Sequence, residues 1–241
     1  MMILKRENNF TATRSLREIT DTTMKNFTKP GNAVAVLLLA MTFTIAACST
    51  TGMQRSEDVQ SDMRTVDNDI KVIVVQLDAI NASLDELTKP GQADVKRAFD
   101  VYSENVSKIE KMEKDFSKHA DQMTKSGKKY FEEWDKNKNQ YDNPDLQRSS
   151  DERRAALGRT YDKIGMNNKG VKEAFKVYVS DVTEIETFMS NDLTNKGITS
   201  IALMSDRTVR NGIHLKNELV NLQSAIEDAR AEMTQTGISM N

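Results

Sequence analysis

The sequence predicts an all-α protein: an elongated, antiparallel four-helix bundle or coiled coil that follows a lipoprotein signal peptide. The first observation is a repeat of apolar residues at alternating spacings of four and three, the pattern of helices that pack along a seam. The second is the scarcity of turn residues, with 10 glycines and 3 prolines in 241 residues, where a β-sandwich would need frequent turns. Short breaks also divide the repeat into four segments, and short connections make consecutive helices antiparallel.

The chain begins with the features of an export signal. An apolar run from Ala33 to Ala47 follows Lys25 and Lys29 and ends at Cys48, the only cysteine. Positive charge, an apolar stretch of this length and small residues before a thiol are typical of bacterial lipoproteins, because a signal peptidase binds the small residues and the thiol takes up a diacylglyceryl group. A membrane-spanning helix needs ~20 apolar residues, so this run is too short to be one.

The signal predicts where the mature protein is held. Residues 1–47 form the signal peptide, cleavage falls between Ala47 and Cys48, and Cys48 carries the lipid, with palmitate among its acyl chains. Translation from Met24 gives the same mature protein. Because Ser49 rather than an acidic residue follows the cysteine, we expect sorting to the periplasmic face of the outer membrane of a Gram-negative bacterium. The alternative is an ordinary helix that ends in a buried structural thiol.

The mature chain is weakly acidic. The whole chain has 34 Lys and Arg against 36 Asp and Glu, and its first 47 residues hold six of the basic and three of the acidic side chains. The mature part therefore has 28 basic and 33 acidic side chains, a net charge of about −5. This balance argues against a nucleic-acid partner and against a polybasic membrane patch, both of which require an excess of Lys and Arg. With its single cysteine acylated, the chain forms no disulfide and depends on packing for its stability.

The first two helical segments share a nearly continuous core seam, meaning the row of apolar heptad positions that faces the neighbouring helices. Lys89-Pro90-Gly91 separates them, because proline lacks a backbone donor and clashes with the preceding turn. The first seam consists of Val59, Met63, Val66, Ile70, Ile73, Leu77, Ile80, Leu84 and Leu87. The second consists of Val95, Phe99, Tyr102, Val106, Ile109, Glu113, Phe116, Ala120, Met123, Gly127, Tyr130 and Trp134.

Two starting points are open for the third helix after the polar stretch 137–144. Asn143 offers a cap with Pro144 at the first helical position, and Ser149 to Glu152 offer a capping box. The third seam consists of Leu157, Tyr161, Ile164, Asn168, Val171, Phe175, Tyr178, Val182, Ile185 and Met189.

A break at 194–197 precedes the fourth helix. Its seam is lined by small or polar residues in the first half and by leucines in the second: Ile198, Ile201, Ser205, Thr208, Gly212, Leu215, Leu219, Leu222, Ile226, Ala229 and Met233. We therefore expect a lipidated linker over 48–57, a helical domain over 58–236 and a tail over 237–241.

Glu113 and Asn168 are polar residues at core positions of the seam. A carboxylate in the core would have a raised pKa unless it were paired, so Glu113 is a candidate for a proton-linked or ligand-binding site inside the bundle. The alternative is a rotated helix that turns Met112 inward, since a straight helix drifts by ~20° per heptad. We expect Asn168 to set the register of packing at some cost in stability.

The sequence contains no recognisable catalytic or metal-binding motif. A di-iron bundle uses Glu-x-x-His pairs, and neither His119 nor His214 has a glutamate three residues before it. A single acylated cysteine also argues against a zinc site. We therefore expect a protein that is not an enzyme, with no catalytic residues, no metal and no cofactor.

The stretch from Tyr130 to Tyr161 carries motifs more specific than a coiled coil. It reads Tyr-Phe-Glu-Glu-Trp-Asp at 130–135, Gln-Tyr-Asp-Asn at 140–143 and Leu-Gln-Arg-Ser-Ser-Asp-Glu-Arg at 146–153. These residues resemble an uncharacterised bacterial family of exported coiled-coil proteins, the domain of unknown function DUF2959. The family has Arg-Arg-Ser-Ser-Glu-Arg at the helix start; here Gln147 replaces the first Arg and Asp151 is inserted. The resemblance implies a helical fold and an envelope location, and it implies no activity.

This stretch contains a candidate interaction cluster at the expected tip of the second hairpin. One interpretation is that aromatic side chains and a capped helix start hold the tip together. The other is that they form a docking surface, since Trp, Tyr and Arg are preferred anchors of interfaces. The cluster consists of Tyr130, Phe131, Trp134, Tyr141 and Arg148.

The pattern favours a structural or adaptor role in the cell envelope, in which the lipid anchor contacts the membrane and the helices present a surface to another envelope protein. The alternative is a binding module for a lipid or another hydrophobic ligand, with its cavity beside Ser205, Thr208 and Gly212. Because a heptad seam closes equally well within one chain or between chains, the sequence does not decide the oligomeric state.

Overall fold

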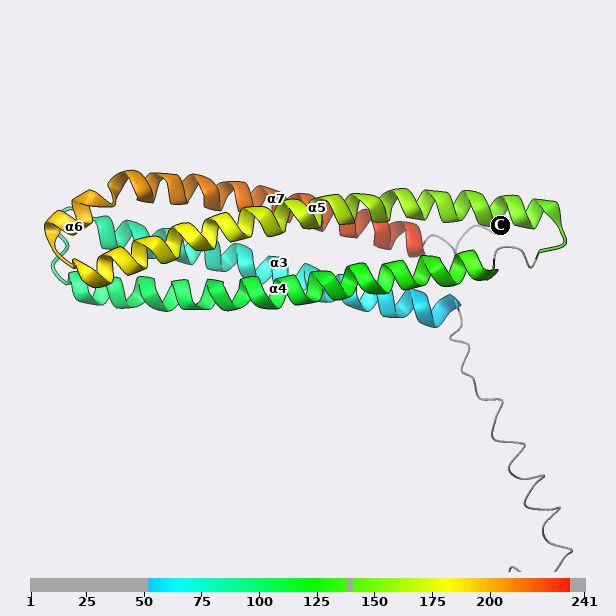
Figure 1. Cartoon of the computed structure of the whole chain (residues 1–241), viewed down its shortest axis with the longest axis horizontal. Helices are drawn as coiled ribbons and strands as arrows, with labels where there is room; N and C mark the ends of the chain where they lie inside the picture. Colours follow the sequence, from blue (N-terminus) through cyan, green and yellow to red (C-terminus); the bar gives the residue numbers. More distant parts are fainter. Residues whose placement is uncertain (1–51, 138–140, 235–241) are drawn as a thin grey trace, which may run out of the picture. The chain divides into compact units, whose positions relative to one another are not determined.

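A computed structural model describes residues 52–137 and 141–234, and within these ranges it contains helices and no strand. Four of these helices are long, and they lie side by side with alternating directions (Figure 1). The prediction of an all-α four-helix bundle is thus confirmed. Its elements are α3 (Gly52–Thr88), α4 (Val95–Asn137), α5 (Pro144–Asn191), the short α6 (Asn195–Ser200) and α7 (Ala202–Thr234).

Each long helix packs against two neighbours. The most extensive contacts join α3 to α4 and α5 to α7, while α4 with α5 and α3 with α7 complete the ring. The first and last helices of the bundle are therefore in contact, and the seam closes within one chain. We call the end where α4 leads into α5 the hairpin end and the opposite end the α6 end (Figure 1).

Most of the buried core residues are residues that the heptad pattern predicts, and Ala98, Ala174 and Ala225 are buried in addition to them. All nine seam residues of α3 are buried, as are Leu215, Leu219 and Leu222 of α7. On α4 and α5 the large buried side chains include Tyr102, Phe116, Phe175 and Tyr178, and the rings of Phe116 and Phe175 lie 6.1 Å apart. Interdigitated packing of this kind is the main source of stability in a bundle without disulfides, at ~25 cal/mol per Å² of apolar surface removed from water.

Proline and glycine end α3 and turn the chain into α4. Gln92 N donates to Lys89 O at 3.2 Å across this turn, and Gly91 has a φ of +73°. Proline at the second position and a positive φ at the third define a type II turn, in which only glycine avoids strain. Asp94 then caps α4 by accepting from Arg97 N at 3.0 Å.

The third helix begins at the first of the two predicted starts. Asn143 is the N-cap, its Oδ1 accepts from Asp145 N at 2.9 Å, and Pro144 is the first helical residue. Proline suits this position because its missing N–H would have no partner inside the helix. Residues 149–152 therefore lie inside α5 and do not cap it.

Two boundaries differ from those expected. Helix α3 begins at Gly52, so residues 52–57 of the expected linker are helical, because no glycine or proline between 53 and 88 stops a helix from propagating backwards. The fourth helix is divided into α6 and α7, with Ile201 between them. The expected tail, 237–241, lies outside the described residues.

Gly127 accommodates an aromatic ring on the opposite helix. A Cβ at this position would lie 2.0 Å from the Tyr161 ring of α5, and the Tyr161 hydroxyl donates to Met123 O at 2.6 Å. The apparent gap in the seam of α4 is therefore the site into which Tyr161 packs. Burial raises the pKa of Tyr161, so its hydroxyl remains a hydrogen-bond donor at neutral pH.

Gly127→Ala should lower the free energy of unfolding by about 1–3 kcal/mol, because Tyr161 must move and its hydrogen bond to Met123 is disturbed. The matched control is Gly165→Ala on α5, where no atom lies within 4 Å of the added Cβ. This change should stabilise the protein by ~0.5–1 kcal/mol, as removing a helical glycine usually does. Urea unfolding followed by circular dichroism measures both; a stabilised Gly127→Ala protein would refute the packing described.

Candidate functional site

Aromatic side chains gather at the hairpin end of the bundle. The Tyr130 ring packs edge-on against Phe131 at 5.5 Å and against Trp134 at 5.7 Å between centroids. Phe131 in turn packs edge-on against Tyr161 of α5 at 5.5 Å. These four rings form what we call the aromatic cluster, and they lie on the α4 and α5 faces that meet near the hairpin.

Polar contacts join the aromatic cluster to the first turns of α5. Trp134 Nε1 donates to Ser150 Oγ at 3.1 Å. The Arg154 guanidinium lies 4.4 Å from the centre of the Phe131 ring and donates to both carboxylate oxygens of Asp135, at 3.0 and 3.1 Å. A cation over an aromatic ring contributes ~0.5–1 kcal/mol at a partly exposed site, so this arginine ties α5 to α4.

The predicted interaction cluster is partly assembled. Tyr130 and Trp134 share a hollow with the exposed Tyr141, and Phe131 joins them through Tyr130. Arg148 is not part of this arrangement: it is exposed and pairs with Asp145 at 3.2 Å.

Helix phase explains which arginine reaches the rings. Residues four apart share a helix face, so Ser150 and Arg154 face α4, while Arg148 points away from it.

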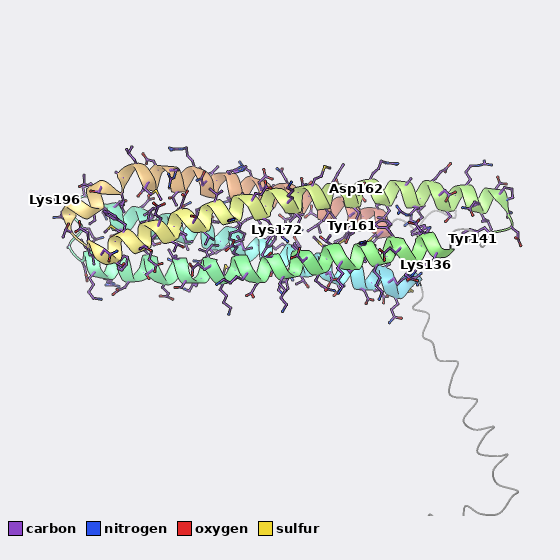
Figure 2. All side chains as sticks on the ribbon, in the orientation of Figure 1. Lys136, Tyr141, Tyr161, Asp162, Lys172 and Lys196 are labelled. Atoms are coloured by element: carbon purple, nitrogen blue, oxygen red, sulfur yellow. The ribbon has the colours of Figure 1, made fainter. Side chains whose placement is uncertain are left out.

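Figure 2 shows Tyr141 and Lys136 at the hairpin end and Lys196 at the α6 end.

Three hollows surround the first turns of α3. One of about 430 Å³ lies between α3 and α4 and is lined by Arg55, Asp58, Asp62, Lys125 and Lys129, among others. A second, of about 270 Å³, is lined by Gly52, Arg55, Tyr130, Trp134 and Tyr141. A third, of about 530 Å³, includes Met53, Tyr130, Arg153 and Met233 in its lining.

Tyr130 belongs to the lining of all three hollows. Burial raises its pKa, although the charges of Arg153 and Arg55 act in the opposite direction. The phenol therefore stays protonated at neutral pH and can donate a hydrogen bond to an anion. Around the start of α3 the hollows thus combine cations, phenol and indole groups with the carboxylates of Glu57, Asp58 and Asp62.

The two polar seam residues differ in their surroundings. Glu113 is partly exposed, and Met112 packs against the core in its place, which is the rotated arrangement of α4. Asn168 is 6 % exposed, and its Oδ1 has no hydrogen-bond partner among the described residues. A buried polar atom without a partner lowers the free energy of unfolding by ~1–3 kcal/mol, so Asn168 reduces the stability of the bundle.

Tyr178 occupies the space that the small residues of α7 leave. A Cβ at Gly212 would lie 2.9 Å from Tyr178 Cε2, and Thr208 is fully buried with its hydroxyl bonded to Met204 O at 2.9 Å. At Gly212 the space expected to form a cavity is thus filled by the Tyr178 ring of the neighbouring helix.

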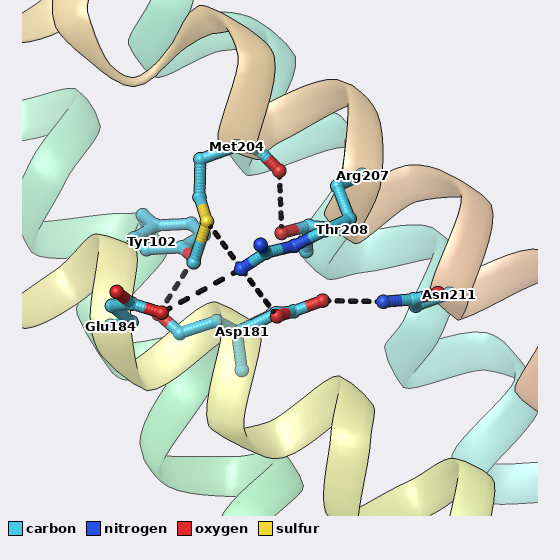
Figure 3. A network of polar contacts seen from close by, with 8 residues as sticks. Tyr102, Asp181, Glu184, Met204, Arg207, Thr208 and Asn211 are labelled. Atoms are coloured by element: carbon cyan, nitrogen blue, oxygen red, sulfur yellow. Dashed lines mark hydrogen bonds and ion pairs between the residues drawn. The ribbon is translucent and has the colours of Figure 1, made fainter.

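A polar network between α5 and α7 was not predicted from the sequence (Figure 3). Asp181 is buried beside the seam residue Val182, and it accepts from Arg207 at 3.0 Å and from Asn211 at 2.6 Å. Arg207 also lies 3.7 Å from Glu184. The only sequence signal was the spacing of Arg207 and Asn211, four residues apart and next to the seam.

Asp67 links α3 to α7 in a similar way. Its carboxylate accepts from Lys71 and from Gln223, both at 2.7 Å. Burial disfavours its charged form, but the hydrogen bonds from Lys71 and Gln223, with the charges of Lys71 and Arg230, outweigh burial and lower the pKa below 3.8.

Neither a membrane-spanning helix nor a metal cluster occurs within the described ranges. No helix there is long and apolar enough to cross a bilayer. No group of three or more His, Cys, Asp or Glu side chains in 52–137 and 141–234 is placed to hold a metal ion. The predicted cleavage and lipidation residues, Ala47 and Cys48, lie outside the described residues.

Asp181→Ala should destabilise the protein by about 1–3 kcal/mol, because Arg207 and Asn211 lose their buried acceptor. Asp206→Ala, which removes an exposed carboxylate next to Arg207, should change stability by less than ~0.5 kcal/mol. Urea denaturation of the two variants tests this difference. Equal stabilities would show that the network contributes nothing to the pairing of α5 with α7.

Asp67→Asn should weaken the dependence of stability on acidic pH. Because the folded-state pKa of Asp67 is lowered, its charge stabilises the fold above the unfolded pKa, and this contribution disappears as pH falls through the folded pKa. The difference in unfolding free energy between wild type and variant should therefore shrink as pH falls from about 7 to below 3.8. A difference independent of pH would contradict the charged pairing.

The comparisons with known proteins identify a family and nothing beyond it. No curated protein matches the chain, and no solved structure matches it. The family described as "Protein of unknown function (DUF2959)" matches residues 57–236, which includes nearly all of the helical bundle and the aromatic cluster. The chain therefore belongs to the DUF2959 family.

Proposed function

We propose that this protein is a lipid-anchored spacer of the bacterial cell envelope, an adaptor that is held by an acylated Cys48 at one end and presents the α6 end to another envelope protein. In this proposal it is not an enzyme, and the anchoring membrane is the outer membrane, as the residue after Cys48 favours. The observation that carries the proposal is the length of α3, which runs without interruption for 37 residues from a point just after the cysteine.

Chain connectivity supplies the geometry of the spacer. Cys48 is four residues before Gly52, so the connecting chain spans at most ~14 Å when fully extended. Helix α3 then extends for ~55 Å, at 1.5 Å per residue. Residues at the α6 end are thereby carried about one helix length away from the anchored end.

The α6 end offers a surface for a partner protein. Leu203 is 85 % exposed, the highest value among the exposed large apolar side chains of the described residues, and Phe188 is 41 % exposed. Both belong to the segments that flank α6, where α5 ends and α7 begins. Single exposed apolar residues are common, but an exposed aromatic ring such as Phe188 at the tip of a spacer is a suitable contact for a partner, because aromatic side chains are enriched at interfaces.

In-cell photo-crosslinking tests the proposal. A photoreactive residue at Leu203 should give a discrete protein adduct, whereas one at Val75, which is 68 % exposed in the middle of α3, should not. The adduct should decrease strongly in a Cys48→Ala variant, which should also leave the membrane fraction and lose acyl mass. Adducts of equal yield at Leu203 and Val75, or a Cys48→Ala protein that remains membrane-bound, would contradict the proposal.

A further inference from the structure

We propose that the hairpin end of the bundle lies on the bilayer surface, with Trp134, Tyr130 and Tyr141 at the depth of the lipid headgroups and the cations around α3 against lipid phosphates. This inference rests on the proposed lipidation of Cys48. It adds a second contact with the membrane, made by the folded bundle itself rather than by the acyl chains.

The tether places this end at the membrane. With at most ~14 Å of chain between Cys48 and Gly52, the first turn of α3 cannot leave the headgroup region by more than that distance. The hollows around Gly52 and Arg55 then face headgroups at a high effective concentration, in the millimolar range for short linkers. At such a concentration, lipid headgroups occupy even sites that bind them weakly.

The side chains at this end have the composition of a membrane interface. Met53 is 74 % exposed, Leu146 is 57 % exposed and Tyr141 is 46 % exposed, while Trp134 and Tyr130 are half-buried between them and the core. Trp and Tyr are enriched at the headgroup level of bilayers because each has an apolar ring and a polar tip. The chain has a single tryptophan, and it lies at this end.

The charges at this end suit lipid phosphates. Arg55, Lys125 and Lys129 line the hollow of about 430 Å³ between α3 and α4, together with the acidic Asp58 and Asp62. The three cations exceed the two carboxylates. Their long side chains can extend towards phosphates while their aliphatic parts remain on the protein.

The unique tryptophan makes the proposal directly measurable. The full-length acylated protein is reconstituted into vesicles of phosphatidylethanolamine and phosphatidylglycerol that contain lipids brominated either near the headgroup or deep in the acyl chains. Trp134 fluorescence should be quenched at least twofold more by the shallow bromines than by the deep ones. Vesicle-bound protein whose Trp134 is not quenched by either lipid would overturn the inference.

A control variant moves the reporter to the opposite end. Trp134→Phe combined with Phe188→Trp places the only tryptophan in the last turns of α5, next to α6, where no quenching is expected. Equal quenching at both positions would mean that the bundle lies flat on the membrane, and it would overturn the inference. Lys125→Gln with Lys129→Gln should roughly halve the shallow quenching; unchanged quenching would overturn the role of these cations.

Flotation and mass separate this inference from the proposal on which it rests. If the protein lacks acyl mass and does not float with vesicles, the proposal of a lipid-anchored spacer is wrong. The proposal that the hairpin end faces the membrane is then wrong as well. If the protein floats and is acylated while Trp134 remains unquenched, the spacer stands and only the membrane-facing hairpin end is wrong.

Discussion

The rest of the structure depends on the closure of one heptad seam by four helices of a single chain. The seam residues of α3 and α7 meet across the ring, so the first and last helices hold each other in place. Where the seam narrows to glycine, a tyrosine from α5 fills the space: Tyr161 at Gly127 and Tyr178 at Gly212. The core is therefore filled at both glycines, and the surfaces that we propose for binding lie at the two ends of the described bundle.

We infer that polar contacts beside the seam favour the observed arrangement of neighbouring helices. Asp67 with Gln223 and Asp181 with Arg207 both include α7, which they attach to α3 and α5 respectively. Hydrophobic burial is non-directional, so a seam alone would allow several arrangements of four helices. Buried carboxylates with specific donors favour one arrangement, since each wrong neighbour would leave a charge without its partner.

The sequence predicted the elements that depend on local rules, and it failed where tertiary geometry decides. The seam of α3, the turn at Pro90-Gly91 and the cap at Asn143 follow from periodicity and backbone chemistry, and all three are present. Arg154 rather than the predicted Arg148 contacts the aromatic rings, because this contact depends on the phase of α5, which the helix start and its packing determine together. The network at Asp181 joins residues 26 and 30 positions apart, and no local pattern indicates such a pair.

The central claim is that the four helices of one chain bury the apolar seam among themselves, without helices from another chain. Native mass spectrometry of residues 49–241 tests this claim most directly. We predict the mass of a single chain over a wide range of concentrations, because the contact between α3 and α7 closes the ring internally. A dimer or larger assembly that persists on dilution would contradict the account, since it would mean that helices of different chains share the seam.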